Sequence, residues 1–120
     1  QVDLVYCVKS RAHAPHLDEI EVLAKVKPNL SLTVHISSTQ GRADVETVLG
    51  QTGVKTTGLV VSFCGPRAMR KSLKSDFSKM GVRSRNFRYE EFEIRTGIGL
   101  RRLAEYVLNR SKAKRLILMD

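Results

Sequence analysis

Hydrophobic positions along the chain alternate between short β-type runs and longer stretches with helical spacing. Residues 2–8 and 30–37 are rich in β-branched side chains, and residues 58–63 are almost continuously apolar, so all three runs predict strands. An apolar run without polar alternation is typical of a strand that is buried on both faces of a parallel sheet. Residues 16–26 and 69–80 have apolar positions three and four residues apart, which predicts two amphipathic helices.

The remaining segments give weaker signals. Residues 37–41 have the composition of a loop, residues 43–49 predict a short helix, and residues 86–89 predict a fourth strand. The apolar spacing of residues 100–108 predicts a last helix, and residues 116–119 fit either a short strand or a tail. Strand and helix alternate along the chain, which indicates an α/β domain: a three-layer Rossmann-like fold with a mostly parallel sheet and helices on both faces.

Composition excludes several classes of protein. The chain has 120 residues, of which 42% are hydrophobic and 28% charged, and this is typical of a single globular domain and not of a disordered chain. No apolar run approaches the length of about 18 residues that indicates a membrane-spanning helix. Only two cysteines occur, so a disulfide scaffold is not expected. Because the chain starts at Gln1 and enters an apolar run at once, we interpret it as a piece of a longer or processed protein.

Charge is distributed unevenly between the two halves. Residues 1–60 hold six basic and six acidic side chains, whereas residues 61–120 hold fifteen basic and six acidic ones and so carry the whole net charge of +9. A basic half indicates an anionic partner, such as a nucleotide cofactor, a nucleic acid, an acidic protein or an anionic membrane surface. The plain alternative is a solvated surface that is rich in Lys and Arg.

Candidate chemistry lies in the three loops that follow the predicted strands, at residues 9–15, 37–42 and 64–67, because ligands of open parallel sheets bind at the carboxyl ends of the strands. Residues 64–67 combine a glycine, which lets a backbone approach a ligand, with a proline suited to the first turn of a helix. A helix N-terminus followed by Arg67 and Arg70 suits a phosphate group. Residues 37–42 supply three hydroxyls and one guanidinium, groups that bind a phosphate monoester. The spacing of the three histidines predicts no catalytic set.

Two motifs together resemble a known family. An apolar strand runs into Cys64-Gly65-Pro66, with Met69 three residues further on, and residues 86–92 end in an E-x-F element. This pair is similar to the NAD(P)-binding module of the ferredoxin–NADP reductase superfamily, in its ferric reductase and NADPH oxidase branch. The resemblance covers residues 1–93 of a C-terminal NAD(P)-binding domain fragment, and residues 94–120 are interpreted as a helical extension. The family's first strand and its G-x-G-x-x-P loop would lie upstream of this chain.

The resemblance implies part of a flavin-dependent reductase, in which NAD(P)H passes hydride to FAD and electrons continue to an acceptor such as ferric iron, heme or oxygen. It implies that Cys64 and Gly65 are the catalytic pair beside the nicotinamide and the flavin. Pro66 and Met69 would shape the pyrophosphate and nicotinamide end of the site.

The resemblance also implies cofactor contacts at two other places. Ser37 stands where the family has a serine on the 2′-phosphate of NADP. Ser38 follows it, where NADP-preferring members often have arginine, and Arg42 would take the role of that arginine. Glu90 is the first residue of E-x-F, and Phe92 is its aromatic at the flavin face. The implied cofactor is NADP, with NAD as the alternative.

The implied partners lie outside this chain. FAD would be bound mainly by an upstream domain of the same protein, so the fragment alone is expected to be inactive. A membrane heme domain or a membrane surface is a further implied partner, whereas nucleic acid is the least expected one. The implied location is intracellular, on the reducing side of a membrane that other segments of the protein would contact, and a mitochondrial location is compatible with it.

Two other interpretations stay open. The chain could be a basic α/β interaction module that binds an acidic partner or nucleic acid, with Phe87 and Tyr89 as stacking groups among the charges. It could also be a degenerate relative of the reductases that keeps the fold without electron transfer.

Overall fold

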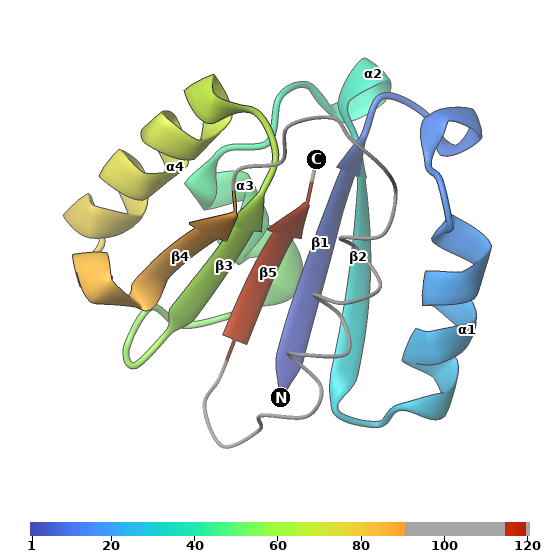
Figure 1. The fold of residues 1–120 in the computed structure, drawn as a ribbon, viewed down its shortest axis with the longest axis horizontal. Helices are drawn as coiled ribbons and strands as arrows, with labels where there is room; N and C mark the ends of the chain where they lie inside the picture. Colours follow the sequence, from blue (N-terminus) through green and yellow to red (C-terminus); the bar gives the residue numbers. More distant parts are fainter. Residues whose placement is uncertain (91–114, 120) are drawn as a thin grey trace.

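A computed structural model of the chain describes residues 1–90 and 115–119, and Figure 1 shows their arrangement. The strands are β1 (Val2–Val8), β2 (Leu30–Ile36), β3 (Val60–Cys64), β4 (Phe87–Glu90) and β5 (Arg115–Met119). The helices are α1 (Leu17–Val26), α2 (Ser37–Gln40), α3 (Val45–Thr52) and α4 (Arg67–Lys79). Two 3-10 turns join them, η1 (Arg11–His13) and η2 (Ser84–Asn86).

The five described strands form one parallel sheet in the order β2-β1-β5-β3-β4. β1 pairs with β2 along its whole length, from Val2 opposite Leu30 to Val8 opposite Ile36. The prediction that the first three apolar runs contribute parallel strands to a single sheet is therefore confirmed. Parallel neighbours need a crossover connection, and α1 supplies it between β1 and β2.

The central strand of the sheet comes from the end of the chain. β5 pairs with β1 on one side and with β3 on the other, so that Leu118 lies opposite both Val5 and Phe63. Residues 115–119 are therefore not part of a helical extension, and the expectation of a short strand at residues 116–119 is confirmed. The physical reason is that a strand with consecutive apolar side chains buries most of its surface in the middle of a sheet, where both faces of the strand are covered.

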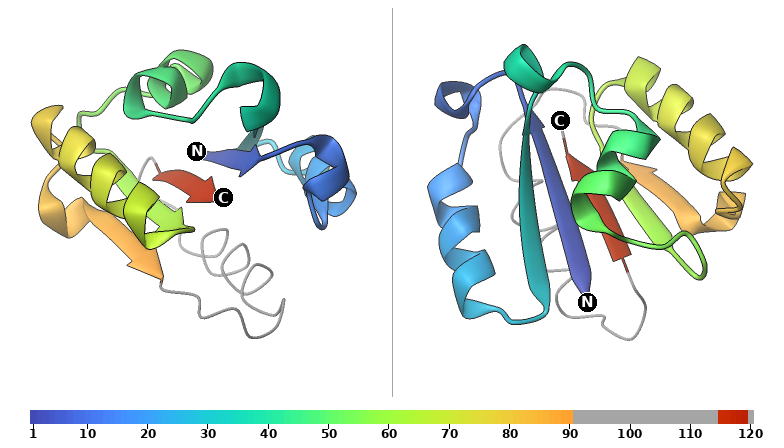
Figure 2. Two further views of the ribbon diagram at one scale, coloured as in Figure 1. Left: turned by 90° about the horizontal axis from the view of Figure 1, so that it is seen from above. Right: turned by 180° about the vertical axis from the view of Figure 1, so that it is seen from behind.

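Helices cover both faces of the sheet (Figure 2). On one face, α3 and α4 pack over a core that includes Val5, Phe63 and Leu118. On the other face, α1 packs over a second core that includes Tyr6 and Ile117. Neighbouring residues of one strand thus enter different cores, as the alternation of side chains along a strand requires. The expected α/β architecture, with a parallel sheet between helical layers, is confirmed for the described residues.

α4 follows the predicted amphipathic pattern, since Met69, Leu73 and Phe77 are buried against the sheet. Its basic side differs from the prediction at Arg70. This side chain is 9% exposed, and its guanidinium carbon lies 4.0 Å from the ring centroid of Tyr89. Arg70 therefore packs on a side chain of β4 and is not one of the freely solvated cations of the helix.

Some sequence predictions fall on residues that are not described. Phe92 and the helix expected at residues 100–108 lie outside residues 1–90 and 115–119. Within the described ranges, no helix is both long enough and apolar enough to cross a membrane.

Candidate functional site

The carboxyl ends of the three central strands form a switch point of the sheet. β1 continues through η1 into α1 on one face, and β3 continues through a short turn into α4 on the opposite face. β5 ends between them. In open parallel sheets, connections that leave in opposite directions open a crevice at the strand ends, and ligands bind there.

A pocket of about 350 Å³ lies at this switch point. Its walls come from the ends of β1, β3 and β5 and from the loop after β1: Tyr6, Cys7, Val8, Lys9, His13, Pro15, Cys64 and Met119. Small-molecule sites have volumes of roughly 300 to 1,000 Å³, so this pocket suits a small ligand or one part of a larger one. The lining is mainly apolar, with Lys9 and His13 as its basic side chains, which favours an uncharged ring that carries an anionic group.

Cys64, a predicted catalytic residue, forms part of the pocket wall. It is 9% exposed and ends β3, opposite Glu90 of β4 and Met119 of β5. Burial and, to a smaller extent, the negative charge of Glu90 raise the pKa of the Cys64 thiol to about 11. The thiol is therefore neutral at physiological pH, so it can contact a ligand but is not activated as a nucleophile.

Gly65 and Pro66 continue from Cys64 into the turn that begins α4. Gly65 is half-buried and Pro66 is exposed, and Pro66 is the N-cap of the helix with an extended backbone. Met69 lies elsewhere: it is 6% exposed and belongs to the core between the sheet and α3 and α4, whereas Cys64 belongs to the core of the other face. The structure thus groups Cys64, Gly65 and Pro66 at the carboxyl edge and buries Met69 in the packing behind them.

The second predicted loop is one turn of helix, because Ser37–Gln40 form α2. Polar residues such as Ser favour both turns and helix starts, so composition does not separate the two. The Ser37 hydroxyl donates to the carbonyl of Val8 over 3.3 Å, and the N–H of Ser38 donates to the carbonyl of Lys9 over the same distance. These bonds join the ends of β1 and β2, and they leave the Ser38 side chain exposed at the carboxyl edge.

Arg42 and Asp44 lie in the link between α2 and α3. Arg42 is exposed. The Asp44 carboxylate caps α3 by accepting a 2.8 Å hydrogen bond from the N–H of Thr47, and this bond holds the pKa of Asp44 below its usual value. The Asp44 charge is therefore held at the start of α3. Ser38 and Arg42 follow β2, which is three strand spacings from Cys64, or roughly 14 Å at the usual separation of parallel strands.

Buried His35 fixes the backbone next to Arg42. Its ring is 0% exposed; Nε2 lies 2.8 Å from the carbonyl oxygen of Gly41, and Nδ1 lies 3.2 Å from the side-chain nitrogen of Gln51. A carbonyl only accepts hydrogen bonds, so the ring proton is on Nε2 and the Gln51 amide donates to Nδ1. His35 thereby joins β2, the α2–α3 link and α3.

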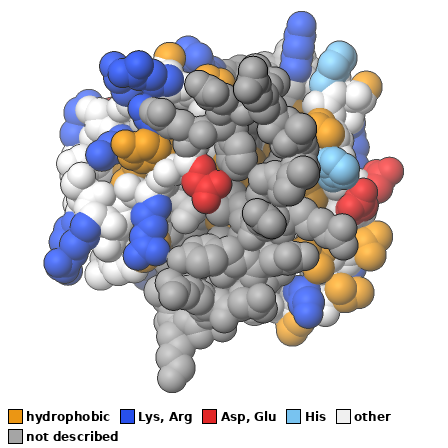
Figure 3. Space-filling view, in the orientation of Figure 1, with side chains coloured by type: hydrophobic (Ala, Val, Ile, Leu, Met, Phe, Trp, Pro, Cys, Tyr) orange, Lys and Arg blue, Asp and Glu red, His pale blue; other side chains and the backbone are white. Residues whose placement is uncertain are grey.

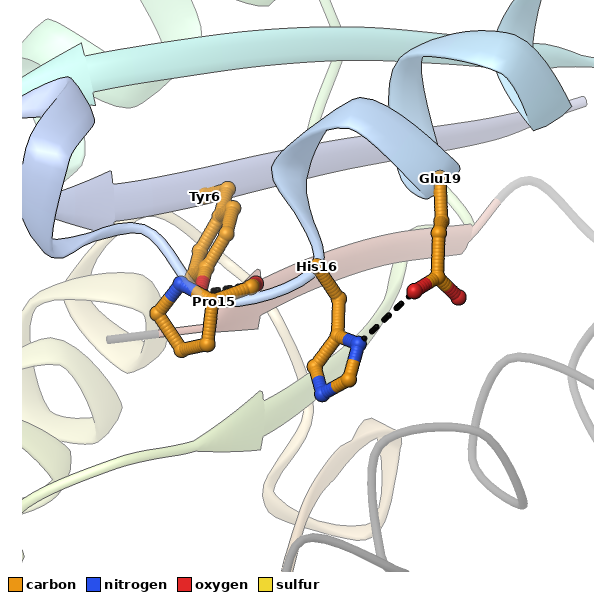
Figure 4. Close-up of polar contacts among 4 residues, drawn as sticks. All are labelled: Tyr6, Pro15, His16 and Glu19. Carbon is orange, nitrogen blue, oxygen red and sulfur yellow. Dashed lines mark hydrogen bonds and ion pairs between the residues drawn. The ribbon is translucent and has the colours of Figure 1, made fainter.

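The end of β1 and the loop after it contribute pocket residues; the sequence predicted the loop at residues 9–15 at this edge, but no motif selected a residue in it. Tyr6 lines the pocket, and its hydroxyl donates to the carbonyl of Pro15 at 3.0 Å (Figure 4). Burial raises the pKa of Tyr6, so the hydroxyl stays protonated and keeps this bond. Lys9 and His13 follow the end of a predicted strand, and this position was the only sequence feature that pointed to a role in ligand binding. It does not identify them as site residues, because single basic residues are common in polar loops.

The start of α1 lies beside this loop. His16 is the N-cap, with a φ of 60° in the left-handed region, which is unusual for a residue other than glycine. Its Nδ1 lies 3.1 Å from a carboxylate oxygen of Glu19, as Figure 4 shows. His16 is the first residue of the helix predicted at residues 16–26, and the structure places it immediately before the first helical residue, Leu17.

The chain matches no protein-family model, no curated protein and no solved structure. In the part of the chain that the structure describes, no group of three His, Cys, Asp or Glu side chains could hold a metal ion.

Proposed function

We propose that this chain is the nicotinamide-nucleotide-binding part of a flavin-dependent reductase. The observation that carries the proposal is Cys64, which lines a pocket at the switch point and leads through Gly65 and Pro66 into α4. When bound, NAD(P)H supplies the hydride and FAD accepts it, so the protein needs no acid or base of its own. The task of the chain is to position the nicotinamide and to exclude water.

The strand order supports a Rossmann-like form of the sheet. The resemblance equates β1 to β4 with the family's second to fifth strands. In the doubly wound order 3-2-1-4-5-6, the first strand lies between the second and the fourth. The observed order follows this scheme, with β5 in the position of the first strand. β5 fills this position, so the sheet has no gap between β1 and β3 for the upstream strand that the resemblance implies.

The residues at the carboxyl edge fit the two ends of an extended dinucleotide. The pocket beside Cys64 is mainly apolar and has room for a nicotinamide ring. Ser38 and Arg42 offer a hydroxyl and a guanidinium beyond β2, where a 2′-phosphate would need them. Both places lie at the same edge of one sheet, so a single extended ligand can reach them.

Each group at the edge has a separate task under this proposal. The neutral Cys64 thiol contacts the ring without competing as a nucleophile, because its pKa is about 11. The hydrogen bond from Tyr6 to Pro15 keeps the opposite wall in place. The first N–H groups of α4, after Pro66, face no intrahelical acceptor and suit the pyrophosphate.

In the full-length protein, Cys64→Ala is expected to slow the reduction of FAD by NADPH by about tenfold to a hundredfold. A small misplacement of reacting groups costs up to roughly a hundredfold in rate, and removing the thiol leaves space beside the ring. The dissociation constant for NADPH is expected to stay within about threefold, because the thiol does not contact the phosphates. Rapid-mixing absorbance of the flavin measures the rate, and a titration measures the affinity.

The matched control is Ser62→Ala, which removes a side-chain oxygen two residues earlier on the same strand and outside the pocket lining. It is expected to leave the rate of flavin reduction near the wild-type value. An unchanged rate in Cys64→Ala would mean that Cys64 is only a packing residue, and equal slowing in both variants would assign the effect to β3 as a whole.

Wild-type chain is expected to bind NADPH about tenfold more tightly than NADH, and Arg42→Ala is expected to remove most of this preference. A charge-assisted hydrogen bond from a guanidinium contributes about 1.5–3 kcal/mol, and exposure of Arg42 to solvent favours the lower end. Calorimetric titration of the purified chain with each nucleotide gives the ratio. Arg83→Ala, another exposed arginine before β4, is the control and should leave the ratio unchanged. Tighter binding of NADH by the wild type would contradict the assignment of Arg42.

A further inference from the structure

The flank of the molecule that carries α4 and β4 is strongly basic. Residues 61–90 hold eight Lys and Arg side chains and two acidic ones, an excess of six positive charges. Figure 3 shows Lys and Arg side chains gathered on this side. The opposite flank differs, because residues 11–30 around α1 hold three basic and three acidic side chains. The net positive charge of the described residues is therefore concentrated at one edge of the sheet, beside β4.

Four of these cations lie along one side of α4. Arg67, Arg70, Lys71 and Lys74 are spaced at i, i+3, i+4 and i+7, and residues with this spacing are neighbours on a helix surface. Arg70 and Lys74 also approach the ring of Tyr89, at 4.0 and 5.8 Å from its centroid. The row of cations thus lies against the edge strand β4. The α4–β4 surface consists of five residues: Arg67, Arg70, Lys71, Lys74 and Tyr89.

The two lysines of this surface have no acidic partner among the described residues. Asp76, the acidic residue of α4, is bound to Lys79 at 2.9 Å, one turn away from the row. Lys71 is exposed and Lys74 is half-buried, and neither forms an ion pair with another described residue. Such cations attract an external layer of negative charge.

The shape of the surface favours a planar partner. The apolar side of α4 is buried in the core through Met69, Leu73 and Phe77, each at most 6% exposed, so the helix cannot insert into a bilayer. Its outer side is a convex row about 10 Å long from Arg67 to Lys74, by the rise of an α-helix, and a convex row meets a plane more readily than it encloses a peptide. Tyr89 is 45% exposed at the margin of the row, and tyrosine is enriched where membranes meet water.

We propose that the α4–β4 surface binds the headgroup layer of an anionic lipid bilayer, by charge and without insertion. A Lys or Arg close to an anionic membrane raises the partition coefficient by about fivefold. Lys71 and Lys74 together therefore account for roughly a 25-fold increase. This proposal is independent of nucleotide binding, because neither lysine belongs to the switch-point pocket.

The test is co-sedimentation of the purified chain with vesicles of phosphatidylcholine alone and of phosphatidylcholine mixed with phosphatidylserine. Wild type is expected to bind only the mixed vesicles, and Lys71→Gln/Lys74→Gln to bind them about 25-fold more weakly. The matched control, Lys25→Gln/Lys27→Gln, removes the same charge from two exposed positions at the end of α1 and is expected to change binding less than threefold. Lys71→Arg/Lys74→Arg should bind like the wild type, which separates loss of charge from loss of folding.

Several outcomes would overturn the proposal. Equal weakening in the two glutamine variants would show that binding follows net charge and not this surface. The protein should also leave the vesicles when salt rises from about 0.1 to 1 M, because the screening length falls from about 10 to 3 Å, and retention at high salt would indicate insertion. Tighter binding of the wild type to duplex DNA, with the same loss in Lys71→Gln/Lys74→Gln, would assign the surface to nucleic acid. Absence of wild-type binding to the mixed vesicles would exclude the proposed membrane binding directly.

Discussion

Truncation after Lys114 is expected to abolish cooperative folding of the remaining chain. β5 is the only connection between β1 and β3 in the described sheet, and its residues from Leu116 to Met119 are at most 5% exposed. Burying one such side chain contributes about 1.5–3 kcal/mol, so four contribute roughly 6–12 kcal/mol. Domains are stable by about 5–15 kcal/mol, which means that the loss is comparable with the whole free energy of unfolding. Thermal melts followed by near- and far-UV circular dichroism measure the result.

Two point variants calibrate this prediction. Leu118→Ala, at a side chain that is 0% exposed, is expected to lower the free energy of unfolding by about 2–5 kcal/mol. Val22→Ala, on α1 at 59% exposure, is expected to change it by less than about 0.5 kcal/mol. A cooperative transition in the truncated chain would show that β5 is an addition to an otherwise complete sheet.

His35→Leu is expected to destabilise the domain by about 1–3 kcal/mol and to weaken NADPH binding as well. The substitution removes both hydrogen bonds of the buried ring, to the Gly41 carbonyl and from the Gln51 amide, and each such bond contributes about 0.5–1.5 kcal/mol. The link that carries Arg42 would also lose its anchor to β2. Urea unfolding gives the stability, and titration with NADPH under native conditions gives the affinity.

Gln51→Ala provides the comparison for His35. It removes one partner of the ring at an exposed position and is expected to cost about 1 kcal/mol, with NADPH affinity near the wild-type value. If His35→Leu were as stable as the wild type, the ring would not be the anchor of the α2–α3 link. If it were destabilised but bound NADPH normally, the link would not contribute to the nucleotide site.

Local pattern identified most of the elements because each depends on residues close in the chain. The spacing of Met69, Leu73 and Phe77 predicts α4, and all three side chains are buried as expected. The apolar run at residues 58–63 predicts β3, which spans Val60–Cys64 and ends there because Gly65 and Pro66 are unfavourable in a central strand. The candidate residue Cys64 could be found for the same reason, since the end of a strand in a parallel sheet is where ligands bind.

Side-chain contacts at the site were less accessible to sequence reasoning. Arg70 has the helical position of a solvated cation but packs on Tyr89, which is nineteen positions away in the chain. Met69 belongs to the same motif as Cys64 but enters the core of the other face, because α4 covers one face of the sheet and the Cys64 side chain points to the opposite face. Tyr6 and His13 become pocket residues only because the end of β1 and the loop after it lie next to the ends of β3 and β5.

The sequence by itself determined that this chain alternates strands and helices, that its strands are parallel and that a polar, phosphate-compatible edge follows them. These properties depend on the period of the apolar pattern and on turn residues, which act within a few positions. Only the tertiary structure decided the order of the strands, because Tyr6 pairs with Met119 across almost the whole chain and no local pattern specifies that contact. The pocket depends on the same pairing, since the short apolar run at residues 116–119 becomes one of its walls only when it lies between β1 and β3.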